Sequence, residues 1–204
     1  MAESCAGREQ ALIAAAERYV RELFAGNAGG HDAEHTLRVR RNAMRIAESE
    51  PGCDALAVEL AALLHDADDP KLFQTEGNAN ARAFLEREGV GAERIERICA
   101  AVNSVSFSQN KGRRPETIEG KIVQDADRLD AIGAVGVARC FAFGGEHARP
   151  MAESVRHFYD KLLLLTDGLN TASARAIAQQ RHAFLEAFLK EYYEETGETP
   201  PDPA

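Results

Sequence analysis

Residues 55–66 read ALAVELAALLHD: nine apolar residues and one glutamate, followed by His65 and Asp66. The leucines recur at helical spacing, at Leu56, Leu60, Leu63 and Leu64. Asp54, immediately before this stretch, is a typical N-cap residue. We therefore predict a helix over residues 55–65 that is buried along most of its length and ends on two polar side chains.

Other helices are predicted on both sides of this stretch, because glycine and proline separate long runs that contain no proline. Upstream, the predicted helices cover residues 8–25 and 31–50. Downstream, they cover residues 76–88, 119–131, 152–166 and 171–195, with a further helix face at Ile95, Ile98 and Val102. The predicted loops cover residues 104–115 and 143–150, and the tail beyond Thr196 is expected to fray.

The composition favours the all-α class. Alanine and leucine account for 53 of the 204 residues, whereas isoleucine, valine and threonine together account for 25. Good helix formers therefore outnumber β-branched residues. The length suits one substantial core. We predict a single helical domain over residues 1–204 with eight or nine helices, in which residues 31–131 form the core, residues 152–195 form the last helices and residues 196–204 form the tail.

Charge and cysteine spacing restrict the partners and the compartment. With 33 acids against 24 bases, the formal charge of −9 argues against binding to nucleic acid or to an anionic membrane through bulk charge. No stretch approaches the roughly 18 apolar residues of a membrane span, and residues 1–10 lack the basic start of a secretory signal. The cysteines are widely scattered, as expected for reduced hydrophobic residues: Cys5, Cys53, Cys99 and Cys140. We expect a cytoplasmic protein.

Four polar residues fall on or at the end of predicted helices and are flanked by apolar residues: His35, His65, Asp66 and Asp127. Each of them taken singly is more often a surface histidine, a cap or a turn residue. Together, two imidazoles and two carboxylates would satisfy one another around a divalent ion with open coordination positions. This mixed set suits Mn²⁺, Fe²⁺, Co²⁺, Ni²⁺ or Zn²⁺ better than Ca²⁺, with Mg²⁺ as a further candidate.

Three strings that contain these residues resemble the HD-domain metal-dependent phosphohydrolase superfamily. They are HDAEHTLRV at 31–39, AALLHD at 61–66 and QDADRLD at 124–130. Their order and separations match the family pattern His…His-Asp…Asp. Within the family, the chain is similar to a branch of small bacterial proteins described as YedJ/YpgQ-like, through residues 106–108, 119–134 and 157–162. The resemblance extends over about residues 31–193 and implies an all-α HD-domain fold.

The resemblance implies four metal ligands: His35, His65, Asp66 and Asp127. Asp125 and Asp130 compete for the last position, and Asp130 shares a helix face with Asp127 because the two are three residues apart. The family pattern selects Asp127 and leaves Asp130 a capping or supporting role. Family members that hold two metals carry further histidines after the HD pair, whereas here the next histidine is His147. We therefore expect one divalent ion per chain.

Five further residues are candidates for catalysis or substrate binding: Asp69, Asp68, Arg38, His31 and Lys111. Related phosphohydrolases often carry an acid four residues after the second histidine that positions or activates water, which selects Asp69 with Asp68 as its rival. Arg38 and His31 lie one helical turn from His35, and Lys111 lies in a basic loop, so all three are candidates for binding phosphate. The alternative interpretation is that the two aspartates only end a helix and that the basic residues are ordinary solvated charges.

The resemblance implies hydrolysis of a phosphomonoester or phosphoanhydride in a small phosphorylated molecule, for which a nucleotide is the leading candidate. A regulatory or ligand-binding HD module with little turnover is the first alternative. A two-iron HD oxygenase is the second, and the missing extra histidines argue against it. The predicted partners are the small substrate and neither nucleic acid nor membrane, and the sequence leaves a homo-oligomer open.

Overall fold

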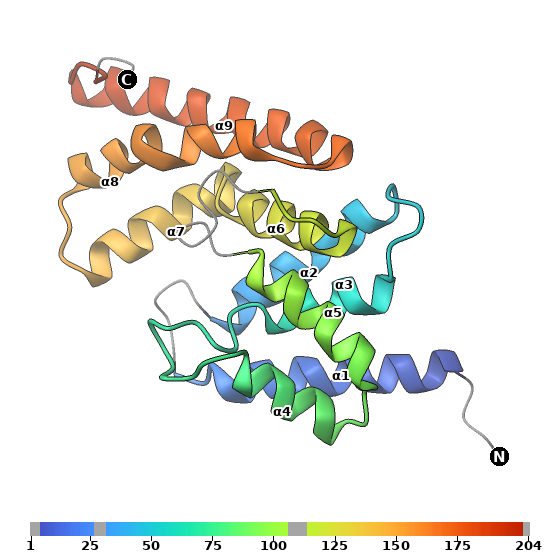
Figure 1. Cartoon of the computed structure of the whole chain (residues 1–204). Coiled ribbons are helices and arrows are strands. Elements are labelled where there is room, and N and C mark those ends of the chain that lie inside the picture. The colour runs from blue at the N-terminus through green and yellow to red at the C-terminus, as the bar shows by residue number, and fades with distance from the viewer. Residues whose placement is uncertain (1–4, 27–31, 106–113, 202–204) are drawn as a thin grey trace. The chain divides into compact units, whose positions relative to one another are not determined.

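The computed structural model describes residues 5–26, 32–105 and 114–201. Within these ranges the regular structure consists of nine α-helices, one π-helical turn and one 3-10 segment, without a β-strand (Figure 1). The predicted all-α class is therefore confirmed. No helix in this part of the chain has the length and apolar character needed to cross a membrane.

Contacts group the chain into two compact units, residues 1–127 and 128–204. The prediction of a single domain over the whole chain stays a prediction. The helices of the first unit are α1 (Cys5–Leu23), α2 (Ala33–Ala47), α3 (Ala55–Leu64), α4 (Ala79–Arg87), α5 (Ala92–Asn103) and α6 (Ile118–Asp130), whose last residues belong to the second unit.

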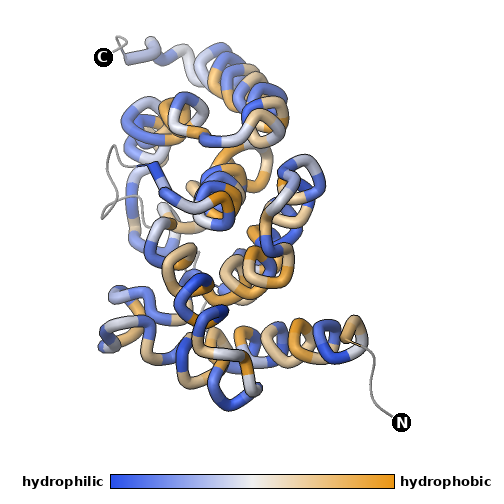
Figure 2. The backbone as a smooth tube through the Cα atoms, turned by 45° about the vertical axis from the view of Figure 1, so that its right-hand side comes forward, coloured by the Kyte–Doolittle hydropathy of each residue, from blue (hydrophilic) through white to orange (hydrophobic). Residues whose placement is uncertain are grey.

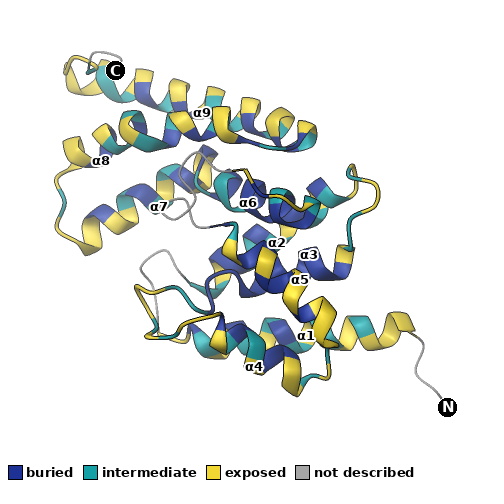
Figure 3. Ribbon diagram, viewed as in Figure 1, coloured by how far each residue is buried: buried dark blue, intermediate teal, exposed yellow. Residues whose placement is uncertain are grey.

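Helix α3 is the central element of the first unit, since it packs against α1, α2 and α5. Nine of its ten residues are buried, which explains why its sequence is apolar on all sides (Figure 3). Helix α1 is different: hydrophobic and hydrophilic residues alternate along it, as expected for a helix with one face on the core (Figure 2). The sequence thus predicts correctly that the helix before His65 is the buried one.

Two aspartates begin the helices that carry the histidines. Asp32 caps α2 by accepting a hydrogen bond from the backbone N–H of His35 at 2.7 Å. Asp54 caps α3 by accepting from the N–H of Ala57 at 3.1 Å, as predicted. The helix predicted over residues 31–50 is shorter at both ends, because Asp32 stands outside it as the N-cap and the helix ends at Ala47, with Glu48 as the C-cap.

Arg40 joins three helices of the first unit in an ion-pair network. From α2 its guanidinium reaches Glu59 of α3 at 2.5 Å and Glu17 of α1 at 2.6 Å. Glu59 is buried, so its charge needs this partner. The network fixes α2 beside α3, the two helices that present His35 and His65.

The second unit contains α7 (Gly133–Glu146), α8 (Met151–His157), a π-helical turn (Phe158–Leu162), a 3-10 helix (Leu163–Gly168) and α9 (Ala172–Thr196). Helix α9 packs on α7 and on the 3-10 helix (Figure 1). The second unit includes an aromatic cluster. In this cluster the ring of Phe158 lies 6.1 Å from that of Phe141 and 5.6 Å from that of Phe188.

Two predictions in this unit are wrong. The loop predicted over residues 143–150 begins later, because α7 continues through Glu146. The single helix predicted over residues 152–166 is instead α8 followed by π and 3-10 turns. The burial of Phe158, Leu162 and Leu165 keeps the i, i+4, i+7 order of a helix. That order does not distinguish α, π and 3-10 hydrogen bonding, so the pattern alone could not reveal the change.

Gly136→Ala is expected to destabilise the second unit. A Cβ at Gly136 would lie 2.3 Å from the carbonyl oxygen of Ala131, a backbone atom that cannot move aside cheaply. Overpacking of this kind costs about 1–3 kcal/mol, which urea denaturation would measure. Gly145→Ala is the matched control on the same helix, since its Cβ would meet no atom within 4 Å. Equal stability of the two variants would contradict this account of Gly136.

Candidate metal centre

The first histidine comes from the N-terminal turn of α2. His35 lies three residues after the cap Asp32, which accepts the hydrogen bond from its backbone N–H. Its side chain is 2% exposed. An imidazole held this deeply by a capped helix needs a polar partner for its ring nitrogens.

The second histidine and the first aspartate stand just beyond α3. His65 is the C-cap residue, and its Nδ1 lies 2.9 Å from the carbonyl oxygen of Ala62. Because a carbonyl oxygen only accepts, Nδ1 carries a proton, which leaves Nε2 as the nitrogen that faces the other donor atoms. A backbone contact that fixes the tautomer in this way is typical of histidines that bind metals. Asp66, with a side chain 11% exposed, brings Oδ2 to 3.4 Å from His65 Nε2.

The second aspartate comes from α6. Asp127 is 31% exposed, and its Oδ1 lies 3.3 Å from His35 Nε2. The neighbouring residue of α6 is tied to α2, because Asn42 donates its side-chain N–H to the carbonyl oxygen of Ala126 at 3.2 Å. Sequence reasoning missed Asn42, although a polar residue between the apolar Val39, Ala43 and Ile46 of the α2 face was a usable signal.

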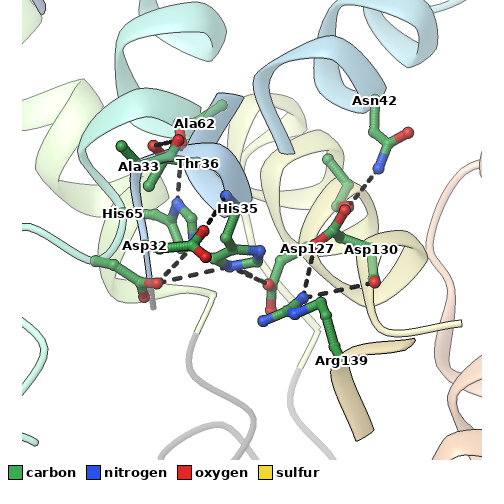
Figure 4. A network of polar contacts seen from close by, with 12 residues as sticks. Asp32, Ala33, His35, Thr36, Asn42, Ala62, His65, Asp127, Asp130 and Arg139 are labelled. Atoms are coloured by element: carbon green, nitrogen blue, oxygen red, sulfur yellow. Dashed lines mark hydrogen bonds and ion pairs between the residues drawn. The ribbon is translucent and has the colours of Figure 1, made fainter. Parts of the chain in front are cut away.

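The donor atoms of His35, His65 and Asp127 face one another (Figure 4). Nε2 of His35 lies 3.2 Å from Nε2 of His65, 3.5 Å from Asp66 Oδ2 and 3.3 Å from Asp127 Oδ1. Two ligands that each lie about 2.1 Å from one ion are about 3.0–3.4 Å apart at bond angles of 90–109°. His35, His65 and Asp127 therefore form a group that can share one divalent ion, with His65 Nε2 and Asp127 Oδ1 the farthest apart at 4.0 Å. Asp66 Oδ2 lies within 3.5 Å of both histidines. In the described ranges of the chain, no other group of three or more such side chains lies this close together.

The electrostatics of Asp127 agree with a ligand role. Desolvation, the largest single influence, raises the pKa of this carboxyl group, but a hydrogen bond to His35 and the charges of His35 and His65 outweigh it. The pKa of Asp127 consequently lies below its ordinary value. The carboxylate is thus ionised at neutral pH, which is the form that binds a metal.

The structure does not support the geometry predicted for Asp69. That prediction needed the helix to continue from His65 to Asp69, whereas α3 ends at Leu64 and a turn follows. Asp69 Oδ1 instead accepts from the backbone N–H of Lys71 at 2.7 Å, as an aspartate in a turn commonly does. The predicted i, i+4 relation between His65 and Asp69 is therefore wrong.

Asp68, the rival of Asp69, is bound to the start of α4. Its Oδ1 accepts from the N–H of Asn80 at 2.9 Å, and its Oδ2 accepts from the N–H of Ala81 at 3.1 Å. Each oxygen thus holds a backbone donor of a helix N-terminus. This arrangement is that of a helix cap and gives no support to Asp68 as the residue that orients water.

The two rivals of Asp127 have other surroundings. Asp130 is buried, and its Oδ2 lies 2.6 Å from a guanidinium nitrogen of Arg139, which agrees with the supporting role expected for it. Asp125 is fully buried. Replacing a carboxylate at a fully buried position is seldom without cost, so Asp125→Asn is expected to lower stability.

The predicted phosphate-binding residues are only partly described. Arg38 is half-buried on α2, one turn after His35. The other two, His31 and Lys111, lie outside the described residues.

The comparisons with known proteins define the class. The sequence profile of the HD domain matches residues 32–132, the segment that includes all four candidate ligands. The chain therefore belongs to the HD domain family, whose members bind divalent metals. YpgQ of Bacillus subtilis (strain 168) is 40% identical to it over 182 residues, which cover 85% of this chain and 88% of YpgQ.

Solved structures agree with this assignment. The crystal structure of Bacillus subtilis YpgQ in complex with ADP matches with a TM-score of 0.79 at 34% identity, covering 96% of this chain and 98% of YpgQ. An HD-superfamily hydrolase from Bacillus thuringiensis matches with a TM-score of 0.76 at 34% identity, covering 94% of this chain and 100% of that one. The family is thus one that includes hydrolases.

Proposed function

We propose that the protein is a metal-dependent phosphohydrolase that acts on a small phosphorylated molecule, with a nucleotide as the preferred class. The observation that carries the proposal is the meeting of His35, His65 and Asp127, whose donor atoms lie 3.2–4.0 Å apart, with Asp66 Oδ2 within 3.5 Å of both imidazoles. The ADP complex of YpgQ supports the choice of a nucleotide. The proposed cofactor is one divalent ion per chain, held by His35, His65, Asp66 and Asp127.

The proposed ligands also leave a path for the substrate. His35 and His65 are buried, whereas Asp127 is 31% exposed, so solvent reaches the centre on its side. When bound, a divalent ion supplies Lewis acidity to a phosphoryl oxygen and lowers the pKa of water from about 15.7 toward about 7. Arg38, one turn after His35, would offset phosphate charge. Asp69 remains our proposal for the group that orients water.

A screen of nucleoside mono-, di- and triphosphates tests the proposal. Each compound is incubated with the protein and Mn²⁺, Co²⁺, Ni²⁺ or Mg²⁺, and orthophosphate and pyrophosphate are assayed separately. We expect metal-dependent release of one of the two. Binding of a nucleotide without release would instead identify a regulatory module, and two irons per chain would favour the oxygenase.

A further inference from the structure

The turn that follows α3 is tied back to α3 at two points: His65 Nδ1 lies 2.9 Å from the carbonyl oxygen of Ala62, and the N–H of Ala67 donates to the carbonyl oxygen of Leu64 at 3.0 Å. A further short-range hydrogen bond runs within the turn, from Asp69 N–H to the carbonyl oxygen of Asp66 at 3.1 Å. His65 and Asp66 both stand in this turn. The position of these two proposed ligands also depends on what holds the rest of the turn.

The first turn of α4 provides that support through two side chains. Asp68 accepts from the backbone N–H groups of Asn80 and Ala81 at 2.9 and 3.1 Å. In the opposite direction, the side-chain amide of Asn80 donates to the carbonyl oxygen of Ala67 at 2.8 Å. Three hydrogen bonds thus link residues 67–68 to residues 80–81 in both directions.

Helix α4 begins in a way that requires this partner. Its N-cap residue, Asn78, has a left-handed backbone (φ 60°) and makes no side-chain cap. The Asn78 amide is used elsewhere, donating to Asn103 of α5 at 3.0 Å. The N–H groups of the first turn are therefore satisfied by the carboxylate of Asp68, whose negative charge is favourable at a helix N-terminus.

The first turns of α4 are themselves anchored to other helices of the first unit. Tyr19 of α1 donates its hydroxyl to the backbone oxygen of Asn80 at 3.3 Å, and its ring stacks on Phe84 of α4 at 4.7 Å. On the other side of α4, Arg82 forms a two-pronged ion pair with Glu96 of α5 at 2.5 and 2.8 Å. The first turn of α4 is thus a fixed point to which the turn after α3 can be attached.

We infer that Asp68 and Asn80 are positioning residues of the proposed metal centre: they fix the turn carrying His65 and Asp66 to the first turn of α4. The inference rests on the proposed function, since it concerns the same centre. Neither residue touches the ion or the substrate. Their effect is on ligand placement, where outer partners commonly change metal affinity by about 10–100-fold.

Two variants test the inference with Co²⁺ as the probe. Asn80→Ala removes the donor to Ala67, and Asp68→Asn replaces one acceptor oxygen by an amide group that cannot accept from a backbone N–H. We expect the dissociation constant for Co²⁺ to rise about 10–100-fold in each. We also expect the visible Co²⁺ spectrum to change, because it reports ligand geometry. Thermal unfolding of the metal-free proteins is measured in parallel.

Glu96→Gln is the matched control, because it weakens the ion pair between Arg82 of α4 and α5 but leaves the link from α4 to the turn intact. It should keep the wild-type Co²⁺ affinity and spectrum. Wild-type affinity and spectrum in both Asn80→Ala and Asp68→Asn would overturn the inference and show that these residues only stabilise α4. Equal losses in Glu96→Gln would overturn it as well. If Asp68→Asn fails to fold, Asn80→Ala, which removes one hydrogen bond and no charge, decides.

The same measurements separate this inference from the proposed function. A wild-type protein that binds Co²⁺ but hydrolyses no phosphorylated compound would refute the proposed function, while the affinities of the variants would still decide the inference. A wild-type protein that binds no Co²⁺ would refute both.

Discussion

His65→Ala is expected to abolish metal binding while the protein stays helical. The variant loses the Nε2 atom that lies 3.2 Å from His35 Nε2 and 3.4 Å from Asp66 Oδ2, and with it one of the four proposed ligands. We expect the affinity for Mn²⁺ or Co²⁺ to fall by at least about 100-fold, the upper end of what loss of an outer partner costs. The same loss is expected for Asp66→Ala.

Thermal and chemical unfolding provide a second measurement of the same loss. A ligand at about 100 times its dissociation constant stabilises the folded state by about 2.7 kcal/mol. The wild type should gain this stability from the metal, and His65→Ala, with an affinity at least about 100-fold lower, should gain about 0.4 kcal/mol or less. His182→Ala is the control, since His182 lies on α9 and pairs with Glu186 there. Wild-type metal occupancy in His65→Ala would contradict the assignment of the centre.

Asp127→Asn is expected to lower turnover by at least about 10²–10³-fold, the loss that follows removal of one charge-stabilising group. The substitution keeps the shape of the side chain but replaces an anionic oxygen, 3.3 Å from His35 Nε2, by a neutral amide. Metal affinity should weaken with it. Steady-state release of phosphate or pyrophosphate, measured on the substrate found in the nucleotide screen, provides the test.

The control for Asp127→Asn has to be an aspartate whose replacement does not disturb the core. Asp160, exposed in the π-helical turn, meets this condition, and Asp160→Asn should keep wild-type turnover. Asp125 does not meet it, because its full burial makes loss of stability the expected result of Asp125→Asn. Retention of turnover in a folded Asp127→Asn variant would exclude Asp127 from the centre.

The sequence was sufficient wherever the information is local. The apolar run over residues 55–64 predicts a buried helix, and the structure buries nine of its ten residues. Asp54 was predictable as a cap because capping depends on a residue and the three that follow it. For the same reason, the order of the histidines and aspartates on helices was readable without knowing how the helices pack.

Choosing among nearby acids required the tertiary structure. Asp127 and Asp130 are one helical turn apart, yet the first meets His35 and the second meets Arg139. Helical periodicity predicts a shared face but does not specify the partner, because partners are set by residues far away in sequence. The resemblance to the HD pattern favoured Asp127, and the 3.3 Å distance to His35 is consistent with it.

The end of α3 likewise could not be predicted from local sequence patterns. The sequence predicted a helix over residues 55–65, and the role of Asp69 required that helix to continue to Asp69, whereas α3 ends at Leu64 and Asp68 turns to α4. The backbone donors that Asp68 satisfies belong to residues 80–81, about a dozen positions downstream, and no local pattern encodes that pairing. The sequence by itself thus determined the helices and the types of ligand they carry. Packing decided where α3 stops and which acids face the histidines, because hydrogen bonds and ion pairs between distant segments form only when the chain closes on itself.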